Sequence, residues 1–172
     1  LRIKVLGIAR AACSYCKDVT AISLPKGLTT IETDAFKDLK YITEICIPES
    51  VVTIGEEAFS QCENLKKVVL PSKLNHLSAG LFSCCTSLEN ISVPQPVKII
   101  DYRCFSYCSN LKNIVLPEGL QKIESYAFQS CESIEKIHIP STVKDIGEAA
   151  FYYCTHLKSI VLPEGLEYVA LG

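Results

Sequence analysis

The sequence predicts a repeat solenoid of the α/β class, built from about seven and a half units of 23 residues over residues 1–172. Three observations predict it. Prolines recur every 23 residues, at Pro25, Pro48, Pro71, Pro94, Pro117, Pro140 and Pro163. Apolar residues stand one, three and six places before each proline and three and six places after it. All six phenylalanines share one position of the repeat. A fixed period in this range marks chains in which one supersecondary unit stacks on copies of itself.

The residues before each proline predict a short strand. Around Pro71, Val68 and Leu70 alternate with Lys67 and Val69, which is the period of a strand with one buried face. Proline has no N–H to donate to a neighbouring strand, so pairing stops where it stands. Prolines aligned in successive units therefore predict parallel strands that all end at one edge of a sheet.

The residues after each proline predict the rest of the unit. Leu74 and Leu77, three places apart, indicate a turn followed by a second short extended or irregular stretch. The sequences Gly-Glu-Glu-Ala-Phe at 55–59 and Gly-Glu-Ala-Ala-Phe at 147–151 contain good helix formers, so a helical turn is predicted on the side opposite the sheet. Such a turn is too short to be stable alone. We expect its phenylalanine to anchor it by packing on the phenylalanines of the neighbouring units.

Residues 111–131 read Leu-Lys-Asn-Ile-Val-Leu-Pro-Glu-Gly-Leu-Gln-Lys-Ile-Glu-Ser-Tyr-Ala-Phe-Gln-Ser-Cys. This pattern resembles the BspA-type leucine-rich repeat of bacterial and protist surface proteins, and the resemblance extends over essentially the whole chain. It implies a right-handed coil with a parallel sheet on one side and short helical turns on the other. It also implies display outside the cell and contact with host or neighbouring-cell macromolecules. The asparagine ladder of the commoner leucine-rich repeat is missing, so we do not expect the horseshoe curvature of that kind.

Six of the ten cysteines share one position, three places after the phenylalanine: Cys16, Cys62, Cys85, Cys108, Cys131 and Cys154. This column fits either a set of disulfides or metal ligands, or a ladder of small buried thiols. The sequence favours buried thiols, because each rung has two equivalent neighbours and a straight ladder does not converge on a point as zinc ligands do. No metal site is therefore expected.

Two further cysteine features stand out. Cys13-Ser-Tyr-Cys16 has the spacing of a redox motif, although the core positions of Cys13 and Cys16 also explain both residues. Cys46 is expected on the outward side of a strand, between Ser23 and Val69, where a thiol is open to modification.

Composition argues against several function classes. The formal net charge is −2 with mixed signs and no basic stripe, so nucleic acid is not an expected partner. No apolar run is long enough to cross a membrane. His76, His138 and His156 occupy three different positions of the repeat, so no set of nucleophile, base and acid is predicted. We expect no enzyme, no cofactor and no small-molecule substrate.

The outward side of the strands is the candidate binding surface, expected to be a concave sheet face that holds a protein or glycoprotein ligand. Its residues are Cys46, Lys67, Val69, Asn90, Ser92, Val115, Lys136, His138 and Val161. The three valines form an apolar track, but valine suits strands whether or not a ligand docks, so both interpretations stay open. Asn90-Ile-Ser92 is also a glycosylation sequon.

Three functions remain compatible with the sequence. The preferred hypothesis, which rests on the resemblance, is a non-catalytic adhesion or recognition module located extracellularly or at the cell surface. A structural stalk or spacer and an intracellular interaction scaffold are the alternatives. The chain opens at Leu1 in mid-strand and ends at Gly172 partway through a unit, without the polar caps that solenoids need. We therefore expect a fragment of a longer protein.

Overall fold

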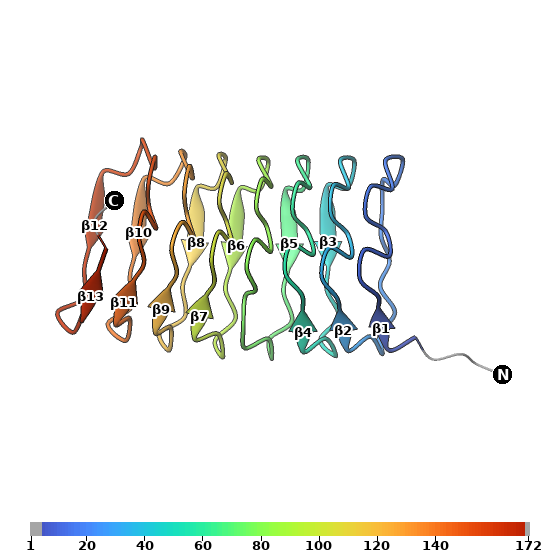
Figure 1. Cartoon of the computed structure of the whole chain (residues 1–172), viewed down its shortest axis with the longest axis horizontal. Coiled ribbons are helices and arrows are strands. Elements are labelled where there is room, and N and C mark those ends of the chain that lie inside the picture. Colours follow the sequence, from blue (N-terminus) through green and yellow to red (C-terminus); the bar gives the residue numbers. More distant parts are fainter. Residues whose placement is uncertain (1–4, 171–172) are drawn as a thin grey trace.

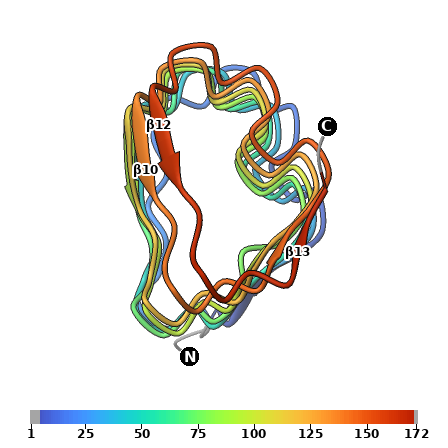
Figure 2. The same cartoon turned by 90° about the vertical axis from the view of Figure 1, so that its left-hand side faces the viewer.

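The structure, a computed structural model, describes residues 5–170. The chain forms a parallel β-solenoid of about seven turns, which follow one another in a nearly straight row (Figure 1). Viewed along the solenoid axis, each coil has three sides: a strand of the first sheet, a strand of the second sheet and a segment of turns (Figure 2). The strand expected at Leu1 and the chain end at Gly172 lie outside the described residues.

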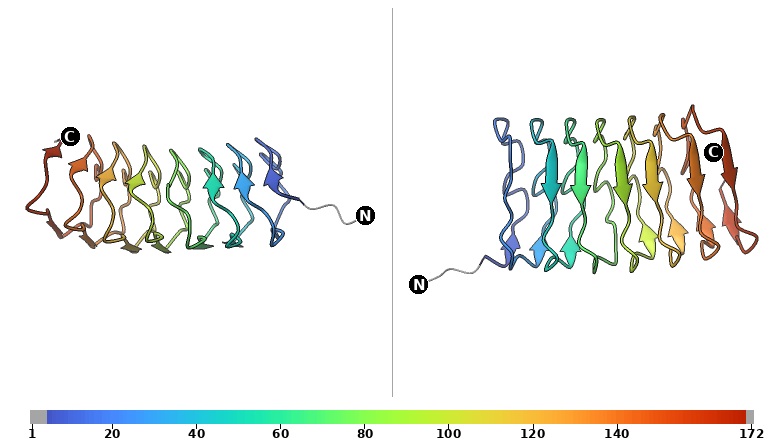
Figure 3. Two further views of the ribbon diagram at one scale, coloured as in Figure 1. Left: turned by 90° about the horizontal axis from the view of Figure 1, so that it is seen from below. Right: turned by 180° about the vertical axis from the view of Figure 1, so that it is seen from behind.

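The first sheet consists of the strands that precede the prolines, seen as a row of parallel arrows in the right-hand view of Figure 3. They are β3 (Glu44–Cys46), β5 (Lys67–Val69), β6 (Asn90–Ser92), β8 (Asn113–Val115), β10 (Lys136–His138) and β12 (Ser159–Val161). Hydrogen bonding joins them in the order β3-β5-β6-β8, with β10-β12 as a separate pair. In β5 the middle residue is buried and the two outer ones are exposed, as the alternation of the sequence predicted.

Each proline ends a strand and starts a turn. The carbonyl of Pro71 accepts a hydrogen bond from the amide of Leu74 at 3.1 Å, and Pro117 accepts one from Leu120 at 3.0 Å. Because proline offers no N–H, it cannot continue the ladder, but its carbonyl can close the turn. The same turn recurs at all seven prolines of the 23-residue series, from Pro25 to Pro163.

The second sheet follows these turns. Its strands are β1 (Gly7–Ile8), β2 (Thr30–Ile31), β4 (Thr53–Ile54), β7 (Ile99–Ile100), β9 (Lys122–Ile123), β11 (Asp145–Ile146) and β13 (Tyr168–Val169). They pair in the orders β1-β2-β4 and β7-β9-β11-β13. Leu77 bridges to Ile100, where the fourth coil has no named strand. The second extended stretch predicted after each proline is therefore present.

The predicted helical turns are wrong, and with them the α/β class: residues 5–170 contain no helix. Amides on the third side instead alternate between two partners. The amides of Gly80 and Phe82 donate to Tyr102 and Cys104 of the next coil, both at 2.8 Å, whereas the amide of Leu81 donates back to Ser78 at 3.2 Å. Such turns consume the amides that an α-helix would need.

The distance between coils explains this outcome. Stacked phenylalanine rings on the third side lie 5.4 to 5.9 Å apart, centroid to centroid. An α-helix with its side chains is about 10 Å across, so helices in successive coils would not fit at this spacing. Glu57 and Ala149, two of the residues that favoured a helix, adopt left-handed backbone angles with φ of 53° and 51°. Tertiary packing has overridden their intrinsic preference.

The core is a set of ladders in which residues at the same position of the repeat pack on one another along the stack. Phe59, Phe82, Phe105 and Phe128 are fully buried, and each ring stacks nearly parallel on the next. Leucine, isoleucine and valine from both sheets fill the rest of each coil. The rings therefore lie in single file, as predicted from their shared position in the repeat.

Candidate functional site

The strand face is the name used here for the exposed side chains of β3, β5, β6, β8, β10 and β12. All nine residues predicted for the binding site lie on it, and all are exposed. Strand register aligns Cys46 with Val69, Ser92 with Val115, and His138 with Val161. The structure therefore brings the predicted residues onto one continuous side of the solenoid.

Three valines make the strand face unusually apolar for an exposed sheet. Val69, Val115 and Val161 have exposed fractions of 43%, 60% and 72%. Each is separated from the next by a polar residue, Ser92 or His138, at the equivalent position. The result is an interrupted apolar track.

A polar row runs beside this track. Register aligns Lys67 with Asn90 and Asn90 with Asn113, and the Asn113 amide donates to the Asn90 side-chain oxygen at 2.7 Å. Lys136 continues the row on β10. Because Asn90 and Asn113 are hydrogen-bonded to each other, their side-chain amides are held in place. A binding partner would meet these two amides with a lysine on either side.

Ion pairs border the strand face where the strands begin. Lys158 and Glu135 are 2.8 Å apart, and Lys112 and Glu89 are 3.8 Å apart. The hydrogen bond from Lys158 lowers the pKa of Glu135, which keeps that carboxylate ionised. These pairs are exposed, so they contribute little stability, but they fix the charge pattern of the rim.

The strand face is only shallowly indented. A hollow of about 320 Å³ lies between β3 and β5, lined by Glu44, Cys46, Lys67 and Val69 among others. A second hollow of about 540 Å³ lies where β8 and β10 begin, beside Lys112, Lys136 and His156. Both are open, with linings that mix polar and apolar surface, which suits contact with a large surface better than enclosure of a small molecule.

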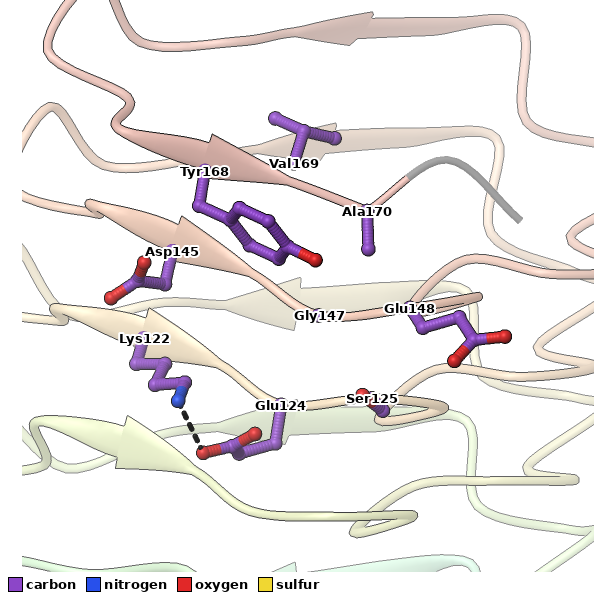
Figure 4. Close-up of a pocket in the computed structure, with 9 residues that line it drawn as sticks. All are labelled: Lys122, Glu124, Ser125, Asp145, Gly147, Glu148, Tyr168, Val169 and Ala170. Atoms are coloured by element: carbon purple, nitrogen blue, oxygen red, sulfur yellow. Dashed lines mark ion pairs between the residues drawn. The ribbon is translucent and has the colours of Figure 1, made fainter.

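A third hollow, of about 640 Å³, lies over the second sheet (Figure 4). Lys122 and Glu124 form an ion pair of 2.9 Å on its floor, and this hydrogen bond raises the pKa of Lys122. The Tyr168 side chain extends from β13, and its ring lies near Gly147 at the hollow (Figure 4). Asp145 and Glu148 add carboxylates that can accept hydrogen bonds, but no nucleophile and base are paired there.

Exposed aromatic residues on the third side were not predicted. The Arg103 guanidinium lies 5.0 Å from the ring centre of Tyr102 and 5.5 Å from that of Tyr126. The two rings meet edge to face at 5.9 Å. Such a cation–π arrangement holds the arginine in place. The signal in the sequence was that these tyrosines occupy none of the core positions of the repeat.

The histidines do not form a catalytic arrangement. His76 pairs with Asp101 at 3.3 Å and His138 with Glu118 at 3.7 Å, on different parts of the surface. Within residues 5–170 no hydroxyl or thiol hydrogen-bonds either histidine. His156 Nδ1 lies 2.8 Å from the backbone carbonyl of Glu132 and 3.4 Å from the hydroxyl of the adjacent Thr155.

The cysteine column is a ladder of S–H donors. Cys62, Cys85, Cys108, Cys131 and Cys154 each contact the phenylalanine carbonyl 26 residues earlier, at 3.1 to 3.3 Å. Burial raises the pKa of Cys62 to about 12 and that of Cys154 to about 11, and it raises those of the others well above the ordinary value. These thiols are protonated and hydrogen-bonded, so they are poor nucleophiles and poor metal ligands.

All ten cysteines are free. Cys46 is exposed on β3, where the sequence placed it. In the described part of the chain no three His, Cys, Asp or Glu side chains are gathered so as to hold a metal ion. Residues 5–170 also contain no helix that is long and apolar enough to cross a membrane.

The coils, their stacked ladders and their open faces define a class, the leucine-rich-repeat-like β-solenoids. The sequence profile of the BspA type leucine rich repeat region, in six copies, matches residues 6–107 and 77–171. The chain belongs to this family.

Three solved structures illustrate the likeness. A leucine-rich repeat protein from Bacteroides ovatus is 38% identical, over 95% of this chain and 43% of its own, with a TM-score of 0.89. One from Eubacterium ventriosum is 27% identical, over 93% of this chain and 42% of its own, with a TM-score of 0.82. A leucine rich cell surface protein from Faecalibacterium prausnitzii is 25% identical, over 95% of this chain and 57% of its own, with a TM-score of 0.50.

The chain thus spans less than half the length of the first two proteins. Comparison with curated proteins finds no match.

Proposed function

We propose that the chain is a non-catalytic binding module of the cell surface, and that its strand face holds a protein or glycoprotein partner. The observation that carries this proposal is the valine track. Val69, Val115 and Val161 place apolar side chains at exposed strand positions, where the fold does not require an apolar residue. Even interrupted by Ser92 and His138, such a track offers a partner apolar surface to cover. The shallow hollows beside the track favour an extended partner.

The surface location rests on the family and on one relative, the Faecalibacterium prausnitzii protein, which is described as a leucine rich cell surface protein. An adhesive role for this chain would follow from such display together with an open binding face. The polar row of Lys67, Asn90 and Lys136 would then orient the partner, because fixed amides and cations add directional contacts beside an apolar track.

The experiment introduces charge into the track. The double substitution Val115→Glu and Val161→Glu should leave the fold intact, because both side chains are already exposed. Binding would be measured by surface plasmon resonance against a panel of purified extracellular-matrix proteins and mucin glycoproteins. We expect the double variant to lose at least about tenfold in affinity for any panel member that the parent chain binds.

Val52→Glu is the matched control, since Val52 is exposed to a similar degree but lies outside the strand face. It should bind like the parent chain. Equal binding by the Val115/Val161 variant, or loss of binding by the Val52 variant, would remove the strand face from the proposal.

A stalk or spacer is the second candidate, and the hydrogen bonding favours it. Successive coils are tied by two sheets and by the alternating amides of the turns, although the first sheet is interrupted between β8 and β10. A stack joined in this way is stiff along its axis. If no panel member binds and the Val115/Val161 variant behaves like the parent chain, a spacer becomes the better explanation.

A further inference from the structure

The third side of the solenoid carries an arginine that is held between two tyrosines. The Arg103 guanidinium lies 5.0 Å from the ring centre of Tyr102, in its own coil, and 5.5 Å from that of Tyr126, in the next coil. Arg103 and Tyr102 are exposed, and Tyr126 is half-buried. Hydrogen-bonded coils lie both before and after this cluster, so its exposure belongs to the flank of the stack and not to an end.

Backbone and ring contacts between coils hold the cluster in shape. The amide of Arg103 donates to the carbonyl of Ser125 at 3.2 Å, and the amide of Tyr126 donates to that of Glu148 at 3.0 Å. The rings of Tyr102 and Tyr126 meet edge to face at 5.9 Å. Little ordering is therefore left for a ligand to impose, which favours binding at an exposed place.

Two acidic residues beside the cluster already have partners. Asp101 accepts the backbone amide of Tyr102 at 2.7 Å through one oxygen and pairs with His76 at 3.3 Å through the other. Glu124, two places before Tyr126, pairs with Lys122 at 2.9 Å. Neither carboxylate is used to neutralise the arginine.

A third acid lies on the other side of the arginine and is also paired. Gly80 holds, in the preceding coil, the position of Arg103, and the Glu57 side chain lies beside it. The Glu57 carboxylate, however, pairs with Lys37. Within residues 5–170 no carboxylate forms an ion pair with Arg103. The guanidinium is thus positioned by two rings and keeps its N–H donors for a ligand.

A guanidinium in this setting suits a carboxylate. Its planar fork matches the two carboxylate oxygens, so that two parallel N–H···O bonds form together. The tyrosine rings add flat apolar faces beside the cation, and their hydroxyls donate and accept hydrogen bonds. A ligand that combines a carboxylate with C–H faces and hydroxyls, as an acidic sugar does, satisfies all of these groups at one time.

The charge of the surroundings favours a ligand with a single negative charge. Asp101 precedes Tyr102 in the sequence, and Glu148 is exposed in the coil that follows Tyr126. These carboxylates would repel a doubly charged phosphate monoester more strongly than a single carboxylate. A neutral, hydroxyl-rich body with one acidic group fits this charge pattern.

We propose that Arg103, Tyr102 and Tyr126 form a binding site for an acidic sugar of a glycan, a pyranose that carries one carboxylate. The guanidinium takes the carboxylate in a bidentate contact. The exposed Tyr102 ring packs on the C–H face of the sugar, and the tyrosine hydroxyls bond to its ring hydroxyls. This site lies on the third side of the coil and is separate from the strand face.

The test titrates the whole chain with two sugars that differ only in the acidic group, methyl β-glucuronide and methyl β-glucoside. Saturation-transfer NMR would follow binding at sugar concentrations up to about 10 mM, because a small exposed site binds weakly. The parent chain should bind the glucuronide at least about tenfold more tightly than the glucoside, since only the glucuronide makes the charge-assisted contact.

Two variants, each with a matched control, locate the site. Arg103→Gln should bind the glucuronide at least about tenfold more weakly than the parent chain. Lys66→Gln removes the same charge from an exposed residue just before β5, and it should bind like the parent chain. Tyr102→Ala should weaken glucuronide binding, whereas Tyr107→Ala, at another exposed tyrosine of the same coil, should not. Circular dichroism and thermal melts would establish that each variant is folded.

A peptide carboxylate is the competing source of the same chemistry. N-acetylglutamate methylamide carries a carboxylate without a sugar ring, and it should bind more weakly than the glucuronide. Equal or tighter binding of this compound would overturn the assignment to a sugar.

Three other results would also overturn the proposal: no saturation transfer from the parent chain to the glucuronide, equal affinity for the two sugars, or effects of the Arg103 and Tyr102 substitutions no larger than those of their controls. The Val115→Glu, Val161→Glu variant should bind the glucuronide like the parent chain, because its changes lie on the strand face. Failure of this site is therefore distinguishable from failure of the proposed binding function.

Discussion

The thiol of Cys108 donates a hydrogen bond to the carbonyl of Phe82, one coil earlier, at 3.2 Å. The same carbonyl accepts the amide of Cys85 at 3.1 Å. Both lone pairs of a fully buried carbonyl are therefore satisfied, one from its own coil and one from the next. This relationship gives the cysteine column a structural role, because cysteine is small enough for the space and still supplies a donor.

Replacing Cys108 by alanine removes this donor. The variant should lose about 1–2 kcal/mol in the free energy of unfolding, from one hydrogen bond and a small cavity. Urea denaturation followed by circular dichroism would measure the loss. Cys46→Ala is the matched control, since that thiol is exposed and should change stability by less than about 0.5 kcal/mol. Equal losses in the two variants would contradict a structural role for the ladder.

The same ladder predicts sensitivity to alkali. Burial raises the pKa of Cys62 from 9.0 to about 12 in the folded chain, and it raises that of Cys108 well above 9.0. In the unfolded chain these thiols ionise from the ordinary value upward. The unfolded state therefore releases more protons as the pH rises, and this contribution to stability, complete below 9.0, is lost progressively above it.

Unfolding free energies measured at several pH values between about 8 and 10.5 would test this expectation. Each fully buried thiol should steepen the alkaline decline by up to about 1.4 kcal/mol per pH unit. A Cys108→Ala, Cys131→Ala variant should show a shallower decline, even though its stability at neutral pH is lower. Parallel curves for the variant and the parent chain would rule out a contribution from these thiols.

The phenylalanine stack predicts a position-dependent cost of truncation. Phe105 is fully buried between Phe82 and Phe128, at centroid distances of 5.7 and 5.4 Å. Phe105→Ala should cost about 3–5 kcal/mol of unfolding free energy, because it empties a site bounded on both sides. Phe151 stacks on Phe128 and is only half-buried, so Phe151→Ala should cost less. Denaturant melts of the two variants would establish the order.

Period and alternation were enough to predict the strands and the core. Val68 is buried between exposed Lys67 and Val69 because strand side chains alternate, whatever the neighbouring coils contain. Phe105 stacks on the phenylalanine rings of the neighbouring coils because all of them occupy the same position of the repeat. The same alternation placed Val115 and His138 on the strand face, and both are exposed there.

Prediction from the sequence failed where contacts between coils determine the local structure. Glu57 and Ala149 favour helices in isolation, but the spacing of the stack leaves no room for one. Arg103 meets Tyr102 and Tyr126 across two coils, and the hollow over Gly147 is walled by residues of three coils. These features depend on relative positions along the stack, which a pattern within one unit does not contain.

Gly147 is required by a close approach between coils. A Cβ atom added there would lie 2.8 Å from the carbonyl carbon of Glu124, in the backbone of the preceding coil. Gly147→Ala should therefore cost about 1–3 kcal/mol of unfolding free energy, because backbone has to move. At Gly165 the nearest atom to an added Cβ is the flexible Lys144 Nζ at 3.0 Å. Gly165→Ala should be tolerated, and thermal melts that ranked the two variants the other way would contradict this packing.

Ala149 distinguishes the observed turns from the helix predicted for the same residues. Its φ of 51° is a left-handed conformation that glycine adopts without strain and alanine does not. Ala149→Gly should leave stability unchanged or raise the free energy of unfolding by up to about 1 kcal/mol, whereas in a helix the same change would cost about 1 kcal/mol. Ala150 next to it is buried and has no left-handed φ, so Ala150→Gly should be destabilising. Urea melts of the two variants give the signs directly, and a marked loss at Ala149 would favour a helical turn on this side of the coil.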